Sequence, residues 1–232
     1  MYIGGKNVAR EYLQNNQPIN KIIISEDLND QTVISLIEKK KIPTEIWKKK
    51  QLDQLVKDHH QGIILDIPDF KYCTLKELLQ QNEFPFFVIL DHLEDPHNFG
   101  AIIRTAEAAG VNGIIIPKDR SVQVTGTVFK TSAGAISNMP ICQVANLTDA
   151  IQKLKKAGVW IVGTDMGKQS YTEVDYNMPI ALVVGNEGKG MSHLIEQNCD
   201  FVVSLPMIGK VNSLNASVAT GIMIYKILEN RK

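Results

Sequence analysis

The chain has 232 residues, and its 25 lysine and arginine residues are balanced by 25 aspartate and glutamate residues, so the formal net charge at pH 7 is zero. Hydrophobic residues make up 44% of the sequence and charged residues 22%, which is ordinary for a globular protein. No apolar run reaches the roughly 18 residues that a membrane span needs, and the first residues lack the basic and then apolar order of a secretion signal. Composition therefore gives no indication of a membrane protein or of export.

The three cysteines, Cys73, Cys142 and Cys199, lie far apart in the sequence. An odd number at this spacing argues against a disulfide framework and against a zinc cluster. It fits the reducing cytosol, so we expect a cytoplasmic protein without a metal site.

The first 67 residues alternate between helical and strand patterns and predict a small α/β unit. Asn29 or Asp30 is expected to cap its second helix. Helices are predicted at residues 4–14, 29–41 and around 52–57, and extended segments at 21–26, 43–47 and 61–67.

A polar stretch at residues 68–85 carries Pro68 and Pro85 and is typical of a linker with one or two helical turns. We therefore predict one domain at residues 1–67, this linker, and a second domain at residues 86–232.

The second domain alternates continuous apolar strands with helices, which predicts a parallel sheet buried on both faces. In such sheets ligands bind at the carboxyl ends of the strands. Strands are predicted at residues 86–93, 113–117, 141–145, 159–165, 180–187 and 201–206, and helices at 99–110, around 125–137, at 146–158 and from about 215 to the end.

Two lysine runs, at residues 39–41 and 48–50, interrupt the otherwise even charge distribution. One interpretation is that they are solvated ends of helices and strands. The other is that they form one patch that contacts phosphates, which would matter because phosphate contacts are counted locally and not by net charge.

The first of three unusual polar loops is "DHLEDPHNFGAIIRTAEAAG". Asn98 lies where a helix cap belongs, and Arg104 lies among alanine and isoleucine on a helix that should be mostly buried. The alternative for Arg104 is a surface ion pair with Glu107 one helical turn away.

The second loop is "VVGNEGKGMS", where three glycines (Gly185, Gly188 and Gly190) permit close approach of the backbone to a ligand. Its glycine order matches neither the Walker phosphate loop nor the dinucleotide fingerprint, and Glu187 would repel a phosphate. The alternative is a simple glycine-rich turn that Ser192 caps.

The third loop, within "LPMIGKVNSLNASVATGIMIYKIL", has four small polar residues in six positions: Asn212, Ser213, Asn215 and Ser217. One of them, Ser213 or Asn215, can cap the terminal helix. Because an unpaired buried polar group costs roughly 1–3 kcal/mol, the others indicate a polar ligand.

Taken together and in this order, the three loops resemble the three signature motifs of the SpoU family of RNA 2′-O-ribose methyltransferases. The resemblance extends from residue 86 to the carboxyl terminus. The first unit, which ends in "HHQGIILDI", resembles the small ribosomal-protein-like domain that binds substrate in many members. The combination of this first unit with the three motifs is most similar to enzymes that methylate a guanosine ribose in large-subunit (23S) ribosomal RNA.

This resemblance implies a fold and a cofactor that periodicity alone does not predict. Family members thread the carboxyl-terminal segment through a loop to form a deep trefoil knot, and they form homodimers through it. They take the methyl group from S-adenosylmethionine, and the matching cofactor positions here are Gly185, Leu205 and Leu214.

The catalytic positions that the resemblance implies are Asn98, Arg104, Glu187, Ser213 and Asn215. Arg104 matches the group often assigned to activation of the 2′-hydroxyl. Because a guanidinium hardly deprotonates, we interpret Arg104 as a clamp on the adjacent phosphate and a stabiliser of the developing alkoxide. Glu187 would orient Arg104 or an asparagine, Asn98 would brace the loop, and Ser213 and Asn215 would contact ribose or phosphate.

Two alternatives stay open at this point. A transfer-RNA ribose methyltransferase uses the same chemistry, although those relatives more often carry basic terminal helices than a separate first domain. A non-catalytic RNA-binding ribosome-assembly factor would have lost signature residues, and this chain has none missing. A nicotinamide-dependent enzyme is disfavoured because the dinucleotide fingerprint is absent.

Overall fold

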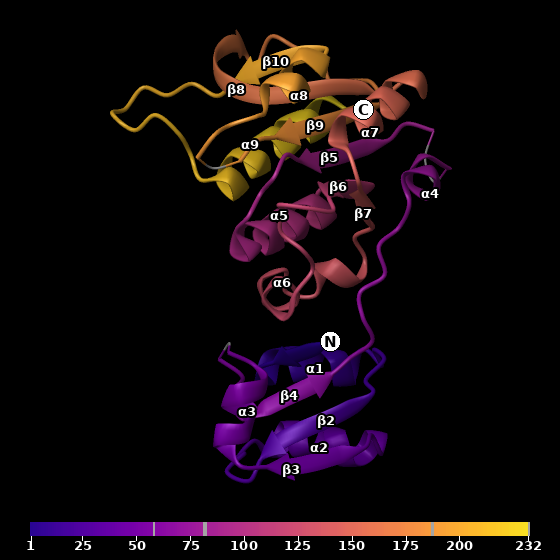
Figure 1. Ribbon diagram of the computed structural model, residues 1–232, viewed down its shortest axis with the longest axis vertical. Helices are drawn as coiled ribbons and strands as arrows, with labels where there is room; N and C mark the ends of the chain where they lie inside the picture. The colour runs from indigo at the N-terminus through magenta and orange to yellow at the C-terminus, as the bar shows by residue number, and fades with distance from the viewer. Residues whose placement is uncertain (58, 81–82, 187, 232) are drawn as a thin grey trace. The chain divides into compact units, whose positions relative to one another are not determined.

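The computed structural model describes residues 1–57, 59–80, 83–186 and 188–231 (Figure 1). The chain folds into two compact units. The amino-terminal unit consists of Met1–Lys71 together with Val124–Gly134, and the carboxyl-terminal unit of Tyr72–Gln123 together with Ala135–Lys232.

The amino-terminal unit contains a four-stranded sheet in the order β1-β4-β2-β3. Strands β2 and β3 are parallel, and β4 is antiparallel to both β1 and β2. The small α/β unit predicted from the sequence is confirmed, with one short strand, β1, that was not predicted. The elements are β1 (Tyr2–Gly4), α1 (Lys6–Gln14), β2 (Lys21–Ser25), α2 (Gln31–Lys40), β3 (Thr44–Trp47), α3 (Lys49–Leu55) and β4 (Ile63–Asp66), joined by α6 (Gly126–Thr131) from later in the chain.

Asp30, and not Asn29, caps α2. Its Oδ1 accepts a hydrogen bond from the backbone N–H of Val33 at 3.1 Å, and its Oδ2 lies 2.7 Å from Nη2 of Arg10. The hydrogen bond from the Val33 amide and the positive charges of Arg10 and Lys6 hold the pKa of this carboxyl below its ordinary value. The same contacts tie α1 to the start of α2.

The carboxyl-terminal unit is built on a six-stranded sheet in the order β10-β8-β9-β5-β6-β7, and all its strand pairs are parallel. The predicted parallel sheet is therefore confirmed. The strands are β5 (Phe86–Leu90), β6 (Gly113–Pro117), β7 (Ile141–Val144), β8 (Trp160–Ser170), β9 (Ile180–Val184) and β10 (Phe201–Ser204). The helices are α4 (Leu75–Gln80), α5 (Pro96–Ala108), the short 3₁₀ helix η1 (Ala135–Ser137), α7 (Leu147–Lys156), α8 (His193–Asn198) and α9 (Ala216–Asn230).

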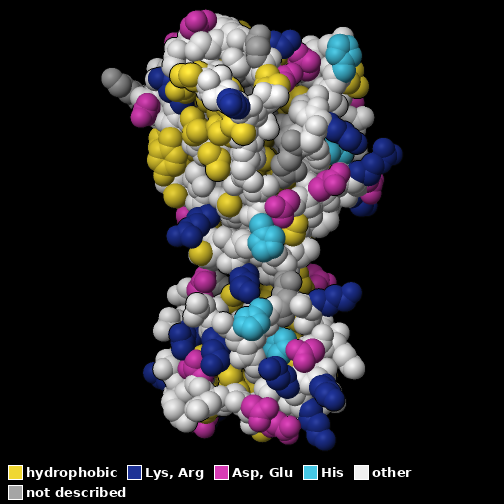
Figure 2. Space-filling view, turned by 90° about the vertical axis from the view of Figure 1, so that its left-hand side faces the viewer, with side chains coloured by type: hydrophobic (Ala, Val, Ile, Leu, Met, Phe, Trp, Pro, Cys, Tyr) yellow, Lys and Arg dark blue, Asp and Glu magenta, His cyan; other side chains and the backbone are white. Residues whose placement is uncertain are grey.

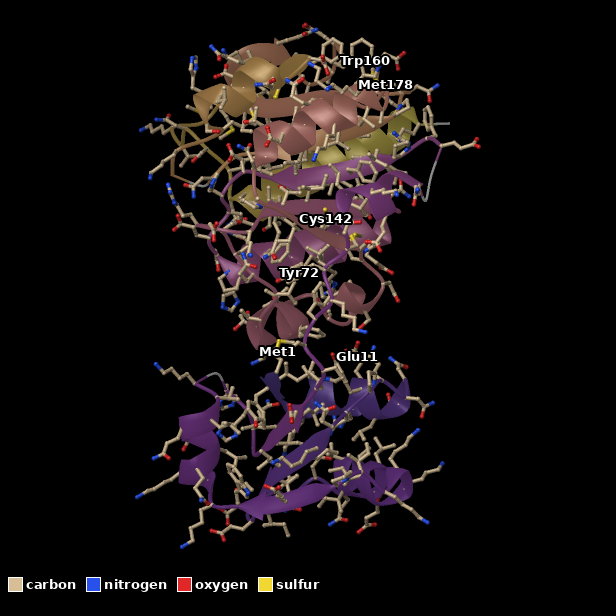
Figure 3. The ribbon with its side chains drawn as sticks, turned by 45° about the vertical axis from the view of Figure 1, so that its right-hand side comes forward. Met1, Glu11, Tyr72, Cys142, Trp160 and Met178 are labelled. Atoms are coloured by element: carbon tan, nitrogen blue, oxygen red, sulfur yellow. The ribbon has the colours of Figure 1, made fainter. Side chains whose placement is uncertain are left out.

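The sheet is buried on both faces, as its continuous apolar strands predict. Alternate side chains such as Phe87 and Ile89 pack with α4, α7 and α8 in one core cluster, which also includes Cys142 on β7 (Figure 3). Because successive side chains in a strand point to opposite faces, Val88 and its counterparts face the other side. There α5 and α9 pack against each other and α9 contacts β9.

The carboxyl end of α9 is anchored to the beginnings of the strands. The guanidinium of Arg231 donates hydrogen bonds to the backbone oxygens of Met178 at 2.7 Å and Pro85 at 3.3 Å, and it lies 4.3 Å from the ring centre of Phe84. Burial lowers the pKa of this guanidinium. The last helix is thereby fixed at its end, which helps to hold its first turn in place at the opposite edge of the sheet.

The structure corrects two details of the predicted helices. Asn98 does not cap α5, because Asp95 does so by accepting from the backbone N–H of His97 at 2.9 Å, with Pro96 in the first turn. The helix predicted around residues 125–137 is two pieces, α6 and η1, which belong to different units.

No helix within the described ranges is long and apolar enough to cross a membrane.

Candidate active site

A cavity of about 390 Å³ lies at the carboxyl ends of β9 and β10 and beside the middle of β8. Parallel strands present their carboxyl ends at one edge of a sheet, so segments distant in the sequence meet there. The cavity is lined by Thr164, Asp165 and Met166 of β8, by Gly185, Asn186, Gly188, Lys189 and Gly190 after β9, and by Leu205, Met207, Asn212, Ser213, Leu214 and Ala216 between β10 and the start of α9.

Four predicted site residues therefore line a single cavity: Gly185, Leu205, Ser213 and Leu214. The second and third polar loops of the sequence converge there. Its walls combine leucine, methionine and alanine side chains with lysine, aspartate, asparagine and backbone groups, so the cavity suits a ligand with both apolar and polar parts.

The loop after β9 closes so tightly that Gly185 has no room for a side chain. The backbones of Asn186 and Gly190 exchange two hydrogen bonds, of 3.0 and 2.9 Å. A Cβ atom on Gly185 would lie 2.2 Å from the carbonyl carbon of Gly190, which real Cβ atoms essentially never do. Only glycine fits, and the backbone of the loop itself forms this part of the cavity wall.

A buried carboxylate holds this loop against the end of β5. Asp91 is 2% exposed, and its Oδ2 accepts a hydrogen bond from the backbone N–H of Ser192 at 2.7 Å while its Oδ1 lies 2.6 Å from Nδ1 of His92. Nδ2 of Asn186 donates to the backbone oxygen of His92 at 2.8 Å. Asp91 and Asn186 were not singled out from the sequence, although a charged residue directly after an apolar strand was a usable signal for Asp91.

The first and third polar loops meet through two asparagines. Nδ2 of Asn215 donates a hydrogen bond to Oδ1 of Asn98 at 2.9 Å, and Asn98 is 8% exposed. Asn215 also caps α9, because its Oδ1 accepts from the backbone N–H of Ser217 at 2.9 Å. Its chain neighbours Leu214 and Ala216 line the cavity, so this asparagine pair lies at the cavity's border.

Arg104 is exposed on α5 and is not among the residues that line the cavity. The ion pair with Glu107 that we considered as an alternative does not form, since no such pair lies within 4.0 Å in the described chain. Instead, Oε1 of Glu107 accepts a hydrogen bond from Nδ2 of Asn138 at 3.2 Å. The expected site residue Glu187 lies outside the described residues.

One ion pair supports the segment of β8 beside the cavity. The ammonium group of Lys168 lies 2.8 Å from Oε1 of Glu196 on α8. This hydrogen bond raises the pKa of Lys168 and lowers that of Glu196. Nearby, burial raises the pKa of the Cys199 thiol to about 12, so that cysteine stays protonated and inert at neutral pH.

Histidine, cysteine, aspartate and glutamate side chains in the described part of the chain form no group of three or more that could hold a metal ion.

Comparisons with known proteins identify the family. The model described as the SpoU rRNA Methylase family matches residues 85–225, and the model described as RNA 2'-O ribose methyltransferase substrate binding matches residues 2–73. A Bacillus subtilis (strain 168) protein, YacO, whose name assigns it to the TrmH family of tRNA/rRNA methyltransferases, is 44% identical over 238 residues, covering 99% of this chain and 96% of its own.

Solved structures share the fold over the whole chain. The SpoU methyltransferase AviRb from Streptomyces viridochromogenes has a TM-score of 0.80 at 23% identity and covers 100% of this chain and 89% of its own. The AdoMet-bound rRNA methyltransferase from Sinorhizobium meliloti has a TM-score of 0.77 at 26% identity and covers 98% of this chain and 86% of its own. The resemblance inferred from the three loops is confirmed, and the chain belongs to the SpoU family of RNA methyltransferases.

Proposed function

We propose that this protein transfers a methyl group from S-adenosylmethionine to a ribose 2′-hydroxyl in structured RNA, and that its target is a guanosine of large-subunit ribosomal RNA in the cytoplasm. The observation that carries the proposal is the convergence of Gly185, Leu205, Ser213 and Leu214 on one cavity. The hydrogen bond between Asn98 and Asn215 at the border of that cavity supports it further.

The cavity fits the cofactor that the family uses. Its volume of about 390 Å³ lies within the range of small-molecule sites. The tight loop at Gly185 offers backbone groups to a close ligand, and Leu205 and Leu214 supply apolar walls for a flat base. We assign these three residues to the cofactor, which supplies an electrophilic methyl group on a sulfonium sulfur when it is bound.

The remaining polar residues act on the RNA. A ribose hydroxyl is a weak nucleophile at neutral pH, so the protein must fix its oxygen and stabilise the charge that develops there. Ser213 has an exposed hydroxyl in the cavity wall and is proposed to contact ribose or phosphate. Asn98 keeps the amide of Asn215 oriented at the same border.

We assign Arg104 to the RNA and not to the cofactor. Its guanidinium is exposed and pairs with no carboxylate among the described residues, so it is available to a phosphate. A planar guanidinium can bind a phosphate through two parallel hydrogen bonds and stay charged at any working pH. Glu187 is proposed to orient Arg104 or one of the asparagines.

Ribosomal RNA is preferred to transfer RNA as substrate on two grounds. The chain carries a separate amino-terminal unit that matches the substrate-binding model, and the Sinorhizobium meliloti neighbour, which is an rRNA methyltransferase by its title, covers nearly the whole chain. A transfer-RNA target is the second candidate, because the Bacillus subtilis relative is named for both RNAs.

The helix α9 supports the predicted homodimer. Val218, Ile222 and Tyr225 are 50%, 40% and 48% exposed and follow each other at helical spacing, while Met223, Ile224 and Ile227 on the same helix are buried. Figure 2 shows hydrophobic side chains gathered in one exposed area of this unit. A helix that is apolar on two faces needs a second partner surface. We propose that this surface belongs to a second copy, and the trefoil knot stays a prediction.

The first prediction tests the reaction and its substrate. Purified protein with labelled S-adenosylmethionine should label large-subunit ribosomal RNA and not transfer RNA, and mass-spectrometric mapping should place the methyl group on a guanosine ribose. Loss of that same modification in cells that lack the gene would confirm it. Labelling of transfer RNA alone would establish the second candidate, and no labelling of either RNA would leave the protein as a non-catalytic RNA-binding factor.

The second prediction concerns the cofactor cavity. Gly185→Ala should abolish binding of S-adenosylmethionine in isothermal titration calorimetry, because a Cβ atom cannot fit beside Gly190 without displacing the loop. Gly209→Ala is the matched control, since a Cβ atom on Gly209 would meet no heavy atom within 4 Å and this residue does not line the cavity. Equal affinities for the two variants would contradict the assignment.

The third prediction separates the roles of Arg104 and the cofactor residues. Arg104→Lys should lower kcat at saturating RNA by about 10²–10³, the loss seen when one transition-state donor is removed. The affinity for S-adenosylmethionine should not change, because Arg104 does not line the cavity. The same substitution at exposed Arg120 serves as control. Near-normal turnover of Arg104→Lys would show that the planar guanidinium is irrelevant.

The fourth prediction concerns assembly. Ile222→Asp puts a charge on the exposed stripe of α9 and should convert a dimer into a monomer in light scattering coupled to gel filtration. Ile46→Asp makes the same change at a residue that is 69% exposed on β3 and should leave the mass unchanged. A dimer that persists with Ile222→Asp would place the interface elsewhere.

A further inference from the structure

A second cavity, of about 540 Å³, lies entirely within the amino-terminal unit. It is formed where β2 ends at Ser25, where α3 begins after β3, and where the chain approaches β4. Because β2 and β3 are parallel, their carboxyl ends lie at the same edge of the small sheet. This is the edge at which α/β sheets bind ligands.

The cavity is lined by three lysines: Lys6, Lys49 and Lys57. Lys6 lies 3.7 Å from the carboxylate of Asp30, whereas Lys49 and Lys57 are exposed and form no ion pair with a described carboxylate. On this unit, Figure 2 shows Lys or Arg side chains together with histidines on one face. Two lysine ammonium groups are therefore free to contact an anion at the cavity.

One wall of the cavity is fixed by a buried histidine. His60 is 4% exposed, its Nδ1 accepts from the backbone N–H of Gly62 at 3.0 Å, and its Nε2 donates to Oδ1 of Asp53 at 2.8 Å. Both ring nitrogens are used, and part of the negative charge of Asp53 is compensated. These hydrogen bonds join α3 to the loop before β4 and hold this wall of the cavity in a defined position.

The lining also offers acceptors and donors for a base. Asp27 and Asn29, in the loop after β2, line the cavity together with the exposed ring of His59. A carboxylate accepts hydrogen bonds from base N–H groups, and an amide can both donate and accept. Lysines for a phosphate beside such groups match the chemistry of a nucleotide taken out of a helix, which is how proteins commonly recognise structured RNA.

We propose that this cavity binds one unpaired nucleotide of the RNA substrate, with Lys49 and Lys57 on its phosphate and Asp27 and Asn29 on its base. The proposal rests on the proposed function, since it takes RNA as the substrate. It also assigns different roles to the two lysine runs of the sequence, because they lie at different edges of the small sheet. Residues 48–50 follow β3 at the edge with the cavity, whereas residues 39–41 precede β3 and lie at the opposite edge, one strand length of about 13 Å away.

The test compares three variants of the full chain in filter binding to deproteinised large-subunit ribosomal RNA at several KCl concentrations. Lys49→Gln/Lys57→Gln should weaken binding by about tenfold or more and reduce the slope of log affinity against log salt by about 1–2. Lys39→Gln/Lys41→Gln removes the same charge at the opposite edge and should stay within about twofold of wild type, with an unchanged slope. Equal effects of the two double variants would overturn the proposal.

The third variant, Asn29→Trp, distinguishes entry into the cavity from attraction to surface charge. It adds bulk to the lining without changing charge, so affinity should fall while the salt slope stays as in wild type. Wild-type affinity of Asn29→Trp would overturn the nucleotide pocket even if the lysines contribute.

Turnover separates this proposal from the proposed function. All three variants should keep wild-type affinity for S-adenosylmethionine and wild-type kcat at saturating RNA, because the cavity lies outside the methyl-transfer site. If wild-type protein transfers no methyl group, the proposed function fails, and the variant comparison still decides the pocket. If wild-type protein is active and the double variants bind RNA alike, the pocket alone fails.

Discussion

The carboxylate of Asp91 is the contact on which the candidate active site depends. A buried charge is costly unless it is fully hydrogen-bonded, and Asp91 receives one N–H from Ser192 and a second from the ring of His92. Ser192 lies at the end of the glycine loop, so this one side chain fixes that loop against the end of β5. Asn186 adds a second link from the same loop to the backbone of His92. The backbone wall at Gly185 can be tight because both of its ends are held.

The crowding of small polar residues before α9 has a physical explanation in this arrangement. Asn215 satisfies the free amides of the first turn and also donates to Asn98 across 117 positions of sequence. Ser217 donates its hydroxyl back to Asn215, while Ser213 and Asn212 remain in the cavity wall. Asn215 thus caps the helix, Ser217 supports Asn215, and Asn212 and Ser213 are left for a ligand. Capping the helix alone would need only Asn215.

How much the sequence predicts depends on how local the cause is. The strands, the parallel sheet and the cap of α2 at Asp30 follow from runs of a few residues, and so does the need for glycine in the loop after β9. The expected cap of α5 at Asn98 is wrong, because Asp95 followed by Pro96 starts the helix three residues earlier. The bond from Ser192 to Asp91 spans 101 positions, and no periodicity predicts such a contact. The resemblance to the family motifs predicted that the three loops belong to one site. The side chains that hold the glycine loop, Asp91 and Asn186, were identified only from the structure.

The neutral net charge of the chain is no argument against RNA once charge is considered by location. Affinity for a polyanion depends on the cations that reach its phosphates, and distant carboxylates are screened within about 10 Å at ordinary salt. In the amino-terminal unit, a four-residue strand separates the two lysine runs by more than that screening length. The proposed nucleotide pocket accordingly uses lysines at one edge of the sheet and not both runs as one basic patch. Lys49 lines the cavity whose wall His60 fixes, whereas Lys40 of the other run lines a smaller cavity of about 220 Å³, so the proposed recognition by this unit depends on where two or three lysines lie and not on how many the chain contains.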